Sequence, residues 1–212
     1  MTEVKICGLM ADATLEAALR GGADYVGLVF FPPSPRNIDP ANARSLAARA
    51  RGRAKVVALM VDPDEAQITT AVIAAAPDLI QLHGAETRER VAAIRRRWGI
   101  PVIKAVPVES ADDVRRALAY AGAADVILFD ARAPADSTRP GGNGAPFDWS
   151  ALATINGKIP YILSGGLTPA NVAEAIRVTG ATAVDVSSGV EVRPGEKDPD
   201  LIRSFIRAAK GV

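Results

Sequence analysis

The sequence has few of the residues that carry redox, metal or nucleic-acid chemistry. Its 212 residues include one cysteine and one histidine, and aromatic residues make up 5%. A single cysteine excludes an intrachain disulfide, and one histidine with no carboxylate-histidine cluster around it argues against a metal site. The 25 Lys and Arg residues are balanced by 24 Asp and Glu residues, so the basic excess of nucleic-acid-binding domains is missing. We therefore expect no metal and no nucleic-acid partner.

Long hydrophobic runs are also missing. The longest apolar run, from Tyr25 to Pro33, ends in two prolines and is far shorter than the 18 or so residues that a membrane helix needs. The segment from Met1 to Lys5 lacks the basic-then-apolar order of a signal peptide. We expect a cytoplasmic protein without a membrane partner.

The chain does contain a regular alternation of short, β-branched apolar runs with longer Ala-, Arg- and Glu-rich stretches of helical spacing. The predicted strands are 4–7, 24–30, 55–61, 79–82, 102–105, 125–130, 160–163 and 183–187. The predicted helices are 12–20, 40–51, 63–76, 87–98, 110–121, 148–154, 169–179 and 198–209. Asp62-Pro63 and Thr168-Pro169 have the pattern of an N-cap followed by a first-turn proline, and Asp148 that of an N-cap.

Eight successive strand-helix units predict an α/β fold, the (βα)8 TIM barrel with eight parallel strands. Continuous apolar strands such as 126–129 suit a parallel sheet covered by helices. The chain allows about 26 residues per unit, which is near the minimum, so we expect residues 1–212 to form a single domain. A doubly wound open sheet is the alternative, but the turn from Cys7 to Met10 lacks a dinucleotide-type glycine fingerprint.

Glycines and serines follow the last two predicted strands. These turns read Ser164-Gly165-Gly166 and Ser187-Ser188-Gly189. Glycines let backbone N–H groups approach an anion, and a following helix N-terminus adds a favourable dipole. The same two loops form the recurrent phosphate site of this barrel. We predict a phosphate site at Gly165, Gly166, Ser187, Ser188 and Gly189; the alternative is that both segments are only tight turns.

Cys7 ends the first predicted strand and Asp130 ends the sixth, at the barrel edge that carries active sites. A lone cysteine is ordinarily a small core residue, but Lys5 should share its face and favour the thiolate. Asp130 has the alternative of capping a turn. Because strands one and six lie on different sides of the barrel, both side chains can face one small substrate. Cys7 is therefore a candidate general base.

Three further side chains are candidates for substrate binding. Arg36 follows a proline-stiffened segment, and its planar guanidinium suits a carboxylate; an ordinary solvated arginine is the alternative. His83 ends the fourth strand and is expected to line the pocket. Asp185 lies inside the eighth strand, where an unpaired carboxylate is costly, so we expect it to have a polar partner in the barrel mouth. The segment 131–147 is long for a barrel loop and predicts a lid, with disorder as the alternative.

Seven segments together resemble the phosphoribosylanthranilate isomerases of the tryptophan pathway. Each segment alone is weak, but all seven occur in register along the chain. They are 5–8 (KICG), 22–27 (GADYVG), 31–36 (FPPSPR), 81–84 (QLHG), 141–149 (GGNGAPFDW), 164–167 (SGGL) and 185–191 (DVSSGVE). Asn143 departs from the Thr or Ser usual in the family's glycine-rich loop.

The resemblance implies a cofactor-free Amadori rearrangement of N-(5-phosphoribosyl)anthranilate to 1-(2-carboxyphenylamino)-1-deoxyribulose 5-phosphate. By similarity, Asp130 is the general acid that protonates the furanose ring oxygen, and Cys7 is the general base that deprotonates the adjacent sugar carbon. Arg36 matches the anthranilate-carboxylate contact, and the glycine and serine turns match the phosphate site. The expected partner is this small phosphosugar-anthranilate substrate, bound by a monomer or homodimer.

Two other functions stay open on the sequence. Another phosphosugar isomerase or epimerase can use the same barrel, but a histidine-pathway relative is expected to have aspartate in place of Cys7. An epimerase typically uses histidines and a metal. A non-catalytic phosphate-binding barrel would keep the glycine turns and need neither Cys7 nor Asp130.

Overall fold

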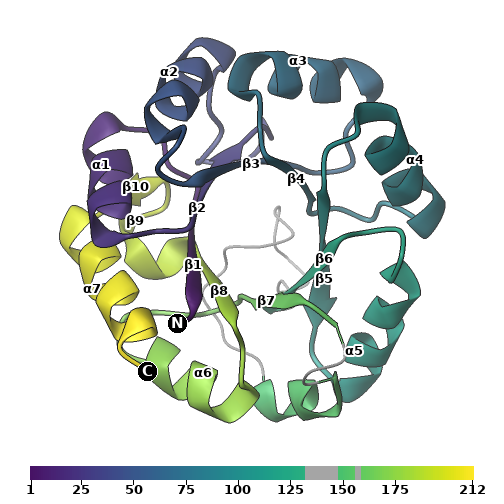
Figure 1. Ribbon diagram of the computed structural model, residues 1–212, viewed down its shortest axis with the longest axis vertical. Helices are drawn as coiled ribbons and strands as arrows, with labels where there is room; N and C mark the ends of the chain where they lie inside the picture. The colour runs from purple at the N-terminus through teal and green to yellow at the C-terminus, as the bar shows by residue number, and fades with distance from the viewer. Residues whose placement is uncertain (132–147, 156–158) are drawn as a thin grey trace.

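Eight parallel strands close into a barrel in chain order (Figure 1). The computed structural model describes residues 1–131, 148–155 and 159–212. The strands are β1 Glu3–Cys7, β2 Tyr25–Val29, β3 Lys55–Met60, β4 Leu79–Leu82, β5 Val102–Val108, β6 Val126–Ala131, β7 Tyr161–Leu163 and β8 Ala183–Val186. The predicted (βα)8 barrel is confirmed.

Helices surround this barrel on its outer side (Figure 1). They are α1 Asp12–Gly21, α2 Pro40–Ala50, α3 Glu65–Ala75, α4 Arg88–Trp98, α5 Ala111–Ala117, α6 Val172–Thr179 and α7 Pro199–Lys210. Three 3-10 helices join them: η1 Leu118–Tyr120, η2 Trp149–Ile155 and η3 Ser188–Val190. The helix predicted over 148–154 is therefore the 3-10 helix η2, and Asp148 caps it as predicted, accepting a hydrogen bond from the Ser150 N–H at 3.0 Å.

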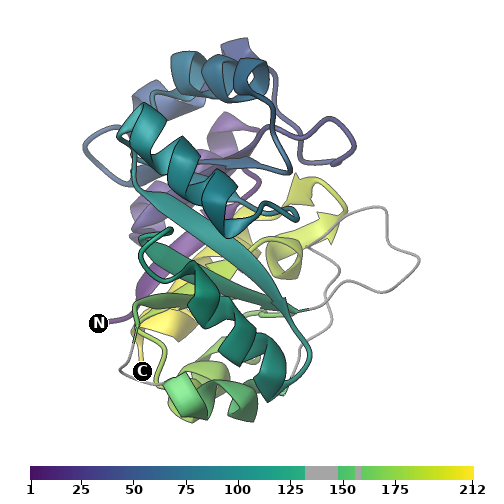
Figure 2. The same cartoon turned by 90° about the vertical axis from the view of Figure 1, so that its right-hand side faces the viewer.

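A short antiparallel hairpin follows η3 and is not among the predicted elements. It consists of β9 Glu191–Arg193 and β10 Glu196–Lys197. Figure 2 shows the two chain termini at one end of the barrel and this hairpin at the opposite end, where β8 leads into it. The hairpin therefore lies at the carboxyl ends of the strands.

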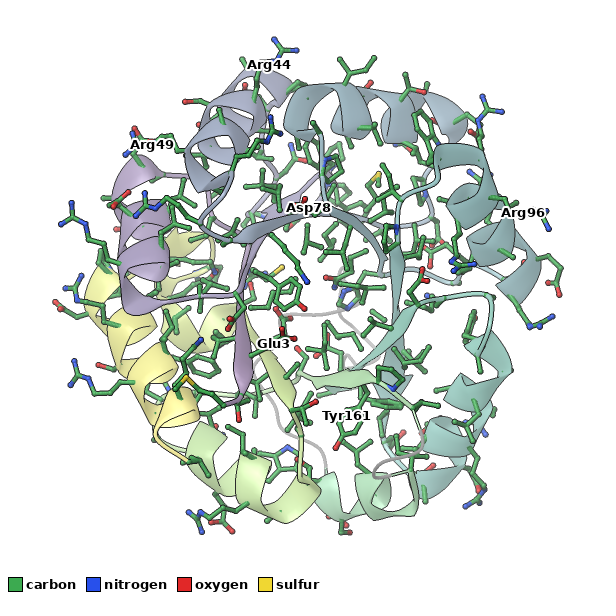
Figure 3. All side chains as sticks on the ribbon, viewed as in Figure 1. Glu3, Arg44, Arg49, Asp78, Arg96 and Tyr161 are labelled. Carbon is green, nitrogen blue, oxygen red and sulfur yellow. The ribbon has the colours of Figure 1, made fainter. Side chains whose placement is uncertain are left out.

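Side chains alternate along the strands between two hydrophobic regions, one between the sheet and the helices and one inside the barrel. Val4 and Ile6 of β1 join a cluster with helix residues such as Leu15 and Phe205. A second cluster contains strand residues, among them Val57, Leu79, Ile103, Leu128 and Ile162. Because successive strand side chains point to opposite faces, residues of the first cluster pack between the helices and the sheet, and residues of the second fill the barrel. Figure 3 shows side chains filling the interior, while Arg44 and Arg96 point outward from the helices.

Two predicted helix starts are wrong. α3 begins at Glu65 because Asp64 is its N-cap: its carboxylate accepts from the Gln67 N–H, and the Gln67 side chain accepts from the Asp64 N–H. This reciprocal capping box satisfies two helix-end donors, so the helix does not start at Pro63. Likewise α6 begins at Val172 rather than at Pro169.

The predicted lid and the predicted absence of a membrane span remain to be compared with the structure. The predicted lid, apart from Ala131, and Asn143 within it lie outside the described residues. No helix in the described ranges is long and apolar enough to span a membrane.

Candidate active site

A cavity of about 650 Å³ opens at the carboxyl ends of the middle strands, within the size range of small-molecule sites. Its lining includes Phe31, Val61, His83, Val106, Tyr120 and Asp130. Cys7 is not part of this lining, but it packs with Val29 and Leu59 in an apolar cluster that Phe31 and Val61 also contact. The thiol therefore lies beside one wall of the cavity, and Asp130 belongs to another.

Burial dominates the electrostatics of Cys7, whose residue is 4% exposed. Desolvation raises the pKa of the thiol, while the positive charges of Lys5 and Lys197 act in the opposite direction and the Asp185 carboxylate adds to the rise. The sequence-based expectation that Lys5 favours the thiolate has the correct sign. The net direction is nevertheless upward, so Lys5 alone does not make the thiol acidic.

Lys5 is itself paired with a buried carboxylate. Its Nζ lies 2.8 Å from Asp185 Oδ1, and both side chains are buried. The Ser164 hydroxyl donates to Asp185 Oδ2 at 3.1 Å. Asp185 thus has the polar partners that its position in β8 predicts. Both carboxylate oxygens are occupied by protein groups, so the expectation that it contacts substrate finds no support in these bonds.

His83 bridges two interior side chains of the barrel. Its Nε2 lies 3.1 Å from Asp130 Oδ2, and its Nδ1 lies 3.0 Å from Gln81 Nε2. Asp130 Oδ1 accepts a hydrogen bond from the Ala131 N–H at 3.0 Å. The predicted acid and the predicted pocket histidine are therefore in direct contact. Gln81 was missed from the sequence as a site residue, although it belongs to the QLHG segment.

A buried ion pair anchors the loop that carries His83. Lys104 Nζ lies 2.7 Å from Glu86 Oε2 and donates to the Gly84 carbonyl at 2.7 Å. The Glu86 carboxylate in turn accepts from the N–H groups of Gly84 and Asp62. These bonds join the ends of β3, β4 and β5, and Asp62, Gly84 and Lys104 contribute to the cavity lining. No sequence pattern predicted this pair, because its members lie on different units of the barrel.

Arg36 is buried and paired, so the alternative of an ordinary solvated arginine is wrong. Its Nε and Nη2 donate to the two carboxylate oxygens of Glu191 at 2.7 and 2.8 Å. Its side-chain stem passes close to Gly8, where a Cβ would lie 2.7 Å from Arg36 Cδ. A side chain at position 8 would therefore displace the guanidinium. The bidentate bond occupies one edge of the fork and leaves Nη1 on the other edge for a carboxylate.

Lys197 completes this arrangement from the unpredicted hairpin. Its Nζ lies 2.9 Å from Glu191 Oε1 and donates to the Ser187 carbonyl at 3.1 Å. Burial acts to raise the pKa of Glu191, but the hydrogen bond from Arg36 and the charge of Lys197 outweigh it and hold this pKa below its ordinary value. Burial lowers the pKa of Lys197, against the opposing charge of Glu191. We call Arg36, Glu191 and Lys197 the Arg36 cluster.

The two glycine turns predicted to bind phosphate lie against one another. A Cβ on Gly189 would come within 1.9 Å of the Leu167 carbonyl oxygen, so only glycine permits this approach. The Ser187 hydroxyl donates to the Cys7 carbonyl at 3.2 Å. A helix N-terminus directly follows only the second turn, where the three-residue 3-10 helix η3 begins at Ser188, whereas α6 begins later, at Val172.

The chain matches known proteins along nearly its whole length. The model of the family "N-(5'phosphoribosyl)anthranilate (PRA) isomerase" matches residues 4–208. The N-(5'-phosphoribosyl)anthranilate isomerase of Rhodopseudomonas palustris (strain HaA2) is 58% identical over 207 residues, which cover 98% of this chain and 95% of that protein. That of Paramagnetospirillum magneticum is 54% identical over 209 residues, covering 99% and 97%. This chain belongs to the PRA isomerase family.

Solved structures of PRA isomerases agree with the barrel described above. The enzyme from Thermotoga maritima has a TM-score of 0.90 and 40% identity, with 100% of each chain covered. A PRA isomerase in complex with reduced 1-(o-carboxyphenylamino)-1-deoxyribulose 5-phosphate has a TM-score of 0.87 and 38% identity, again over 100% of both chains. The predicted family is confirmed, and the chain is an isomerase rather than a non-catalytic barrel.

Among the described residues, no group of three or more His, Cys, Asp or Glu side chains is arranged to hold a metal ion. The polar groups at the barrel mouth instead pair with one another. They can move protons through Cys7 and Asp130, accept a carboxylate at Arg36 and offer backbone donors in the two glycine turns. That combination suits acid-base chemistry on a doubly anionic small molecule.

Proposed function

We propose that this chain converts N-(5-phosphoribosyl)anthranilate into 1-(2-carboxyphenylamino)-1-deoxyribulose 5-phosphate, with Asp130 as acid and Cys7 as base. The observation that carries the assignment is the placement of these two groups on different sides of one barrel mouth, Asp130 in the cavity lining and Cys7 behind its apolar wall. The relatives' names and the product analogue bound by a solved relative support the same substrate. We take residues 1–212 as one domain, acting in the cytoplasm as a monomer or homodimer.

The first step opens the sugar ring. Asp130 gives its proton to the furanose oxygen, the bond from that oxygen to C1 breaks, and the anthranilate nitrogen lone pair forms the C1=N bond of a protonated Schiff base. The negative charge left on Asp130 is stabilised by the Ala131 N–H and by His83, which lie 3.0 and 3.1 Å from its two oxygens. Donors already in place for a developing charge lower the barrier without reorganisation.

The second step moves a proton from carbon. Cys7 takes the proton from C2, and the C–H electron pair forms a C1=C2 bond while the C1=N pair returns to nitrogen. The resulting enolamine tautomerises to the ketone by moving the hydroxyl proton of C2 to C1. Because burial raises the pKa of the thiol, Cys7 needs nearby positive charge to act as a thiolate. Lys5, Lys197 and the cationic Schiff base supply that charge.

Two anionic groups of the substrate remain to be held. The outer edge of Arg36, kept in place by Glu191, suits the anthranilate carboxylate. The backbone N–H groups at Gly165, Gly166, Ser188 and Gly189 suit the 5-phosphate, since N–H groups in glycine-rich turns form anion-binding concavities. His83 lines the cavity beside Asp130. We place Asp185 behind Cys7 as the partner of Lys5 rather than at the substrate.

Loss of phosphoribosylanthranilate fluorescence, followed with the purified protein, tests the proposal. We expect Cys7→Ala and Asp130→Asn each to lower turnover by at least about 100-fold, the usual contribution of a positioned acid or base. Glu174→Gln, an exposed change on α6, is the matched control and should keep full activity. No turnover by the intact protein, or full turnover by both site variants, would contradict the assignment.

A further inference from the structure

Gln81 is a buried polar residue that the reaction described above does not use. It lies in β4 with 0% exposure. Its amide Nε2 lies 3.0 Å from His83 Nδ1, while its Oε1 is buried and has no hydrogen-bond partner among the described residues. Burying an amide with an unsatisfied oxygen is unfavourable compared with an apolar side chain of similar size. Such a residue calls for an explanation beyond packing.

The explanation lies in the two nitrogens of His83. A neutral imidazole has one N–H donor and one acceptor nitrogen. Nδ1 lies 3.0 Å from the amide nitrogen of Gln81, and an amide NH2 group only donates hydrogen bonds. Nδ1 is therefore the acceptor, and the ring proton is on Nε2. This Nε2–H faces Asp130 Oδ2 at 3.1 Å and can donate to it.

We infer that Gln81 is a positioning residue that holds His83 as the Nε2–H tautomer, so that His83 always donates to Asp130 Oδ2. The inference rests on the proposed role of Asp130 as the acid. With the opposite tautomer, the Nε2 lone pair would face Asp130 and compete with the substrate for its proton. With the Nε2–H tautomer, His83 cannot accept that proton, which leaves only the substrate side of the carboxyl group for transfer. We call Gln81, His83 and Asp130 the Asp130 chain.

Nitrogen NMR of the intact protein reads this tautomer directly. The sequence has one histidine, so protein labelled with ¹⁵N-histidine contains one imidazole whose two nitrogens need no separation from others. At a pH of about 8.5, where histidine is ordinarily neutral, we expect the proton on Nε2 and an unprotonated Nδ1. A wild-type ring protonated on Nδ1 would overturn the inference without any variant.

Two substitutions test whether Gln81 causes this preference. Gln81→Met keeps the length and burial but removes the donor, so the single tautomer should give way to a mixture. Gln81→Glu places a carboxylate against Nδ1, so a proton should appear on that nitrogen. Unchanged ring signals in both folded variants would overturn the inference. Failure of both to fold would leave the wild-type measurement as the decisive result.

Kinetics separate this role from a packing role. We expect Gln81→Met to lower kcat by about tenfold or more with KM changed less than about twofold, because an interaction made in the transition state is lost rather than substrate binding. Glu174→Gln, the exposed control change on α6, should leave both constants unchanged. Equal losses in kcat and 1/KM would overturn the inference. If the wild type itself shows no turnover, the proposed function fails, while the NMR result still stands for Gln81.

Discussion

The two polar groups at the barrel mouth are built in different ways. The Asp130 chain joins residues from the strands or strand ends of β4 and β6, and its bridging side chain is a histidine held between an amide and a carboxylate. The Arg36 cluster joins a loop after β2 to a hairpin after β8, and it buries two cations around one carboxylate. The rigid barrel holds the first group. Charge pairing across loops holds the second.

Because the two groups are built differently, we expect them to contribute differently to catalytic rate, stability and substrate binding. Removing a partner from the Asp130 chain leaves the barrel strands in place and changes the position of a proton. Removing Glu191 from the Arg36 cluster leaves Arg36 and Lys197 buried without their anion, which affects folding as well as binding. The comparison therefore predicts a loss of rate at one group and a loss of stability and affinity at the other.

The largest expected effect on stability follows from Glu191→Gln. Breaking a buried ion pair by removing one member costs about 3 to 5 kcal/mol, and the Glu191 side chain is 4% exposed between Arg36 and Lys197. Urea unfolding should show this loss, and KM should rise by about tenfold because Arg36 is no longer held. Glu174→Gln removes an exposed pair with Arg177 and should cost about 0.5 kcal/mol or less. Equal stability of the two variants would remove the distinction between the groups.

A smaller effect concerns the acidity of the lone thiol. Because desolvation raises the pKa of Cys7, the thiolate absorbance should appear at a higher pH than the ordinary value of about 8.5. The difference between the wild type and Cys7→Ala isolates this signal, since the sequence has one cysteine. Lys5→Met should shift the midpoint further upward, because the charge of Lys5 favours the thiolate. A midpoint below the ordinary value, or one unaffected by Lys5→Met, would show that burial and Lys5 do not control the thiol.

The fold could be predicted from the sequence because the alternation of apolar runs and helical stretches extends over the whole chain. Eight apolar runs separated by helical stretches predict the barrel, and each of the eight observed barrel strands overlaps its predicted range. The β9–β10 hairpin was missed because its short strands, EVR and EK, consist mostly of charged residues and contain no apolar run. The start of α3 was wrong because the Asp64–Gln67 capping box outweighs the preference of Pro63 for a first turn.

Candidate site residues could be proposed from the sequence only where the position of a single residue indicates a function. Cys7, His83 and Asp130 end strands, and strand ends mark the reactive face of this fold. Their partners were not predictable, because Arg36 and Glu191 are 155 residues apart and Lys5 and Asp185 are 180 apart. Those contacts exist only once the barrel closes. Gln81 lies two residues before His83, where strand spacing puts both side chains on one face, and that spacing was the signal available in the sequence.

The central claim is that Asp130 acts as the acid in ring opening and Cys7 as the base in the later removal of a proton from carbon. The most direct test is the deuterium isotope effect on turnover of substrate labelled at C2, compared between Cys7→Ser and Asp130→Asn. A weakened base makes C–H cleavage limiting, so Cys7→Ser should show a clear primary isotope effect. A weakened acid makes ring opening limiting, so Asp130→Asn should show almost none. A large effect in Asp130→Asn and none in Cys7→Ser would contradict the two assigned roles.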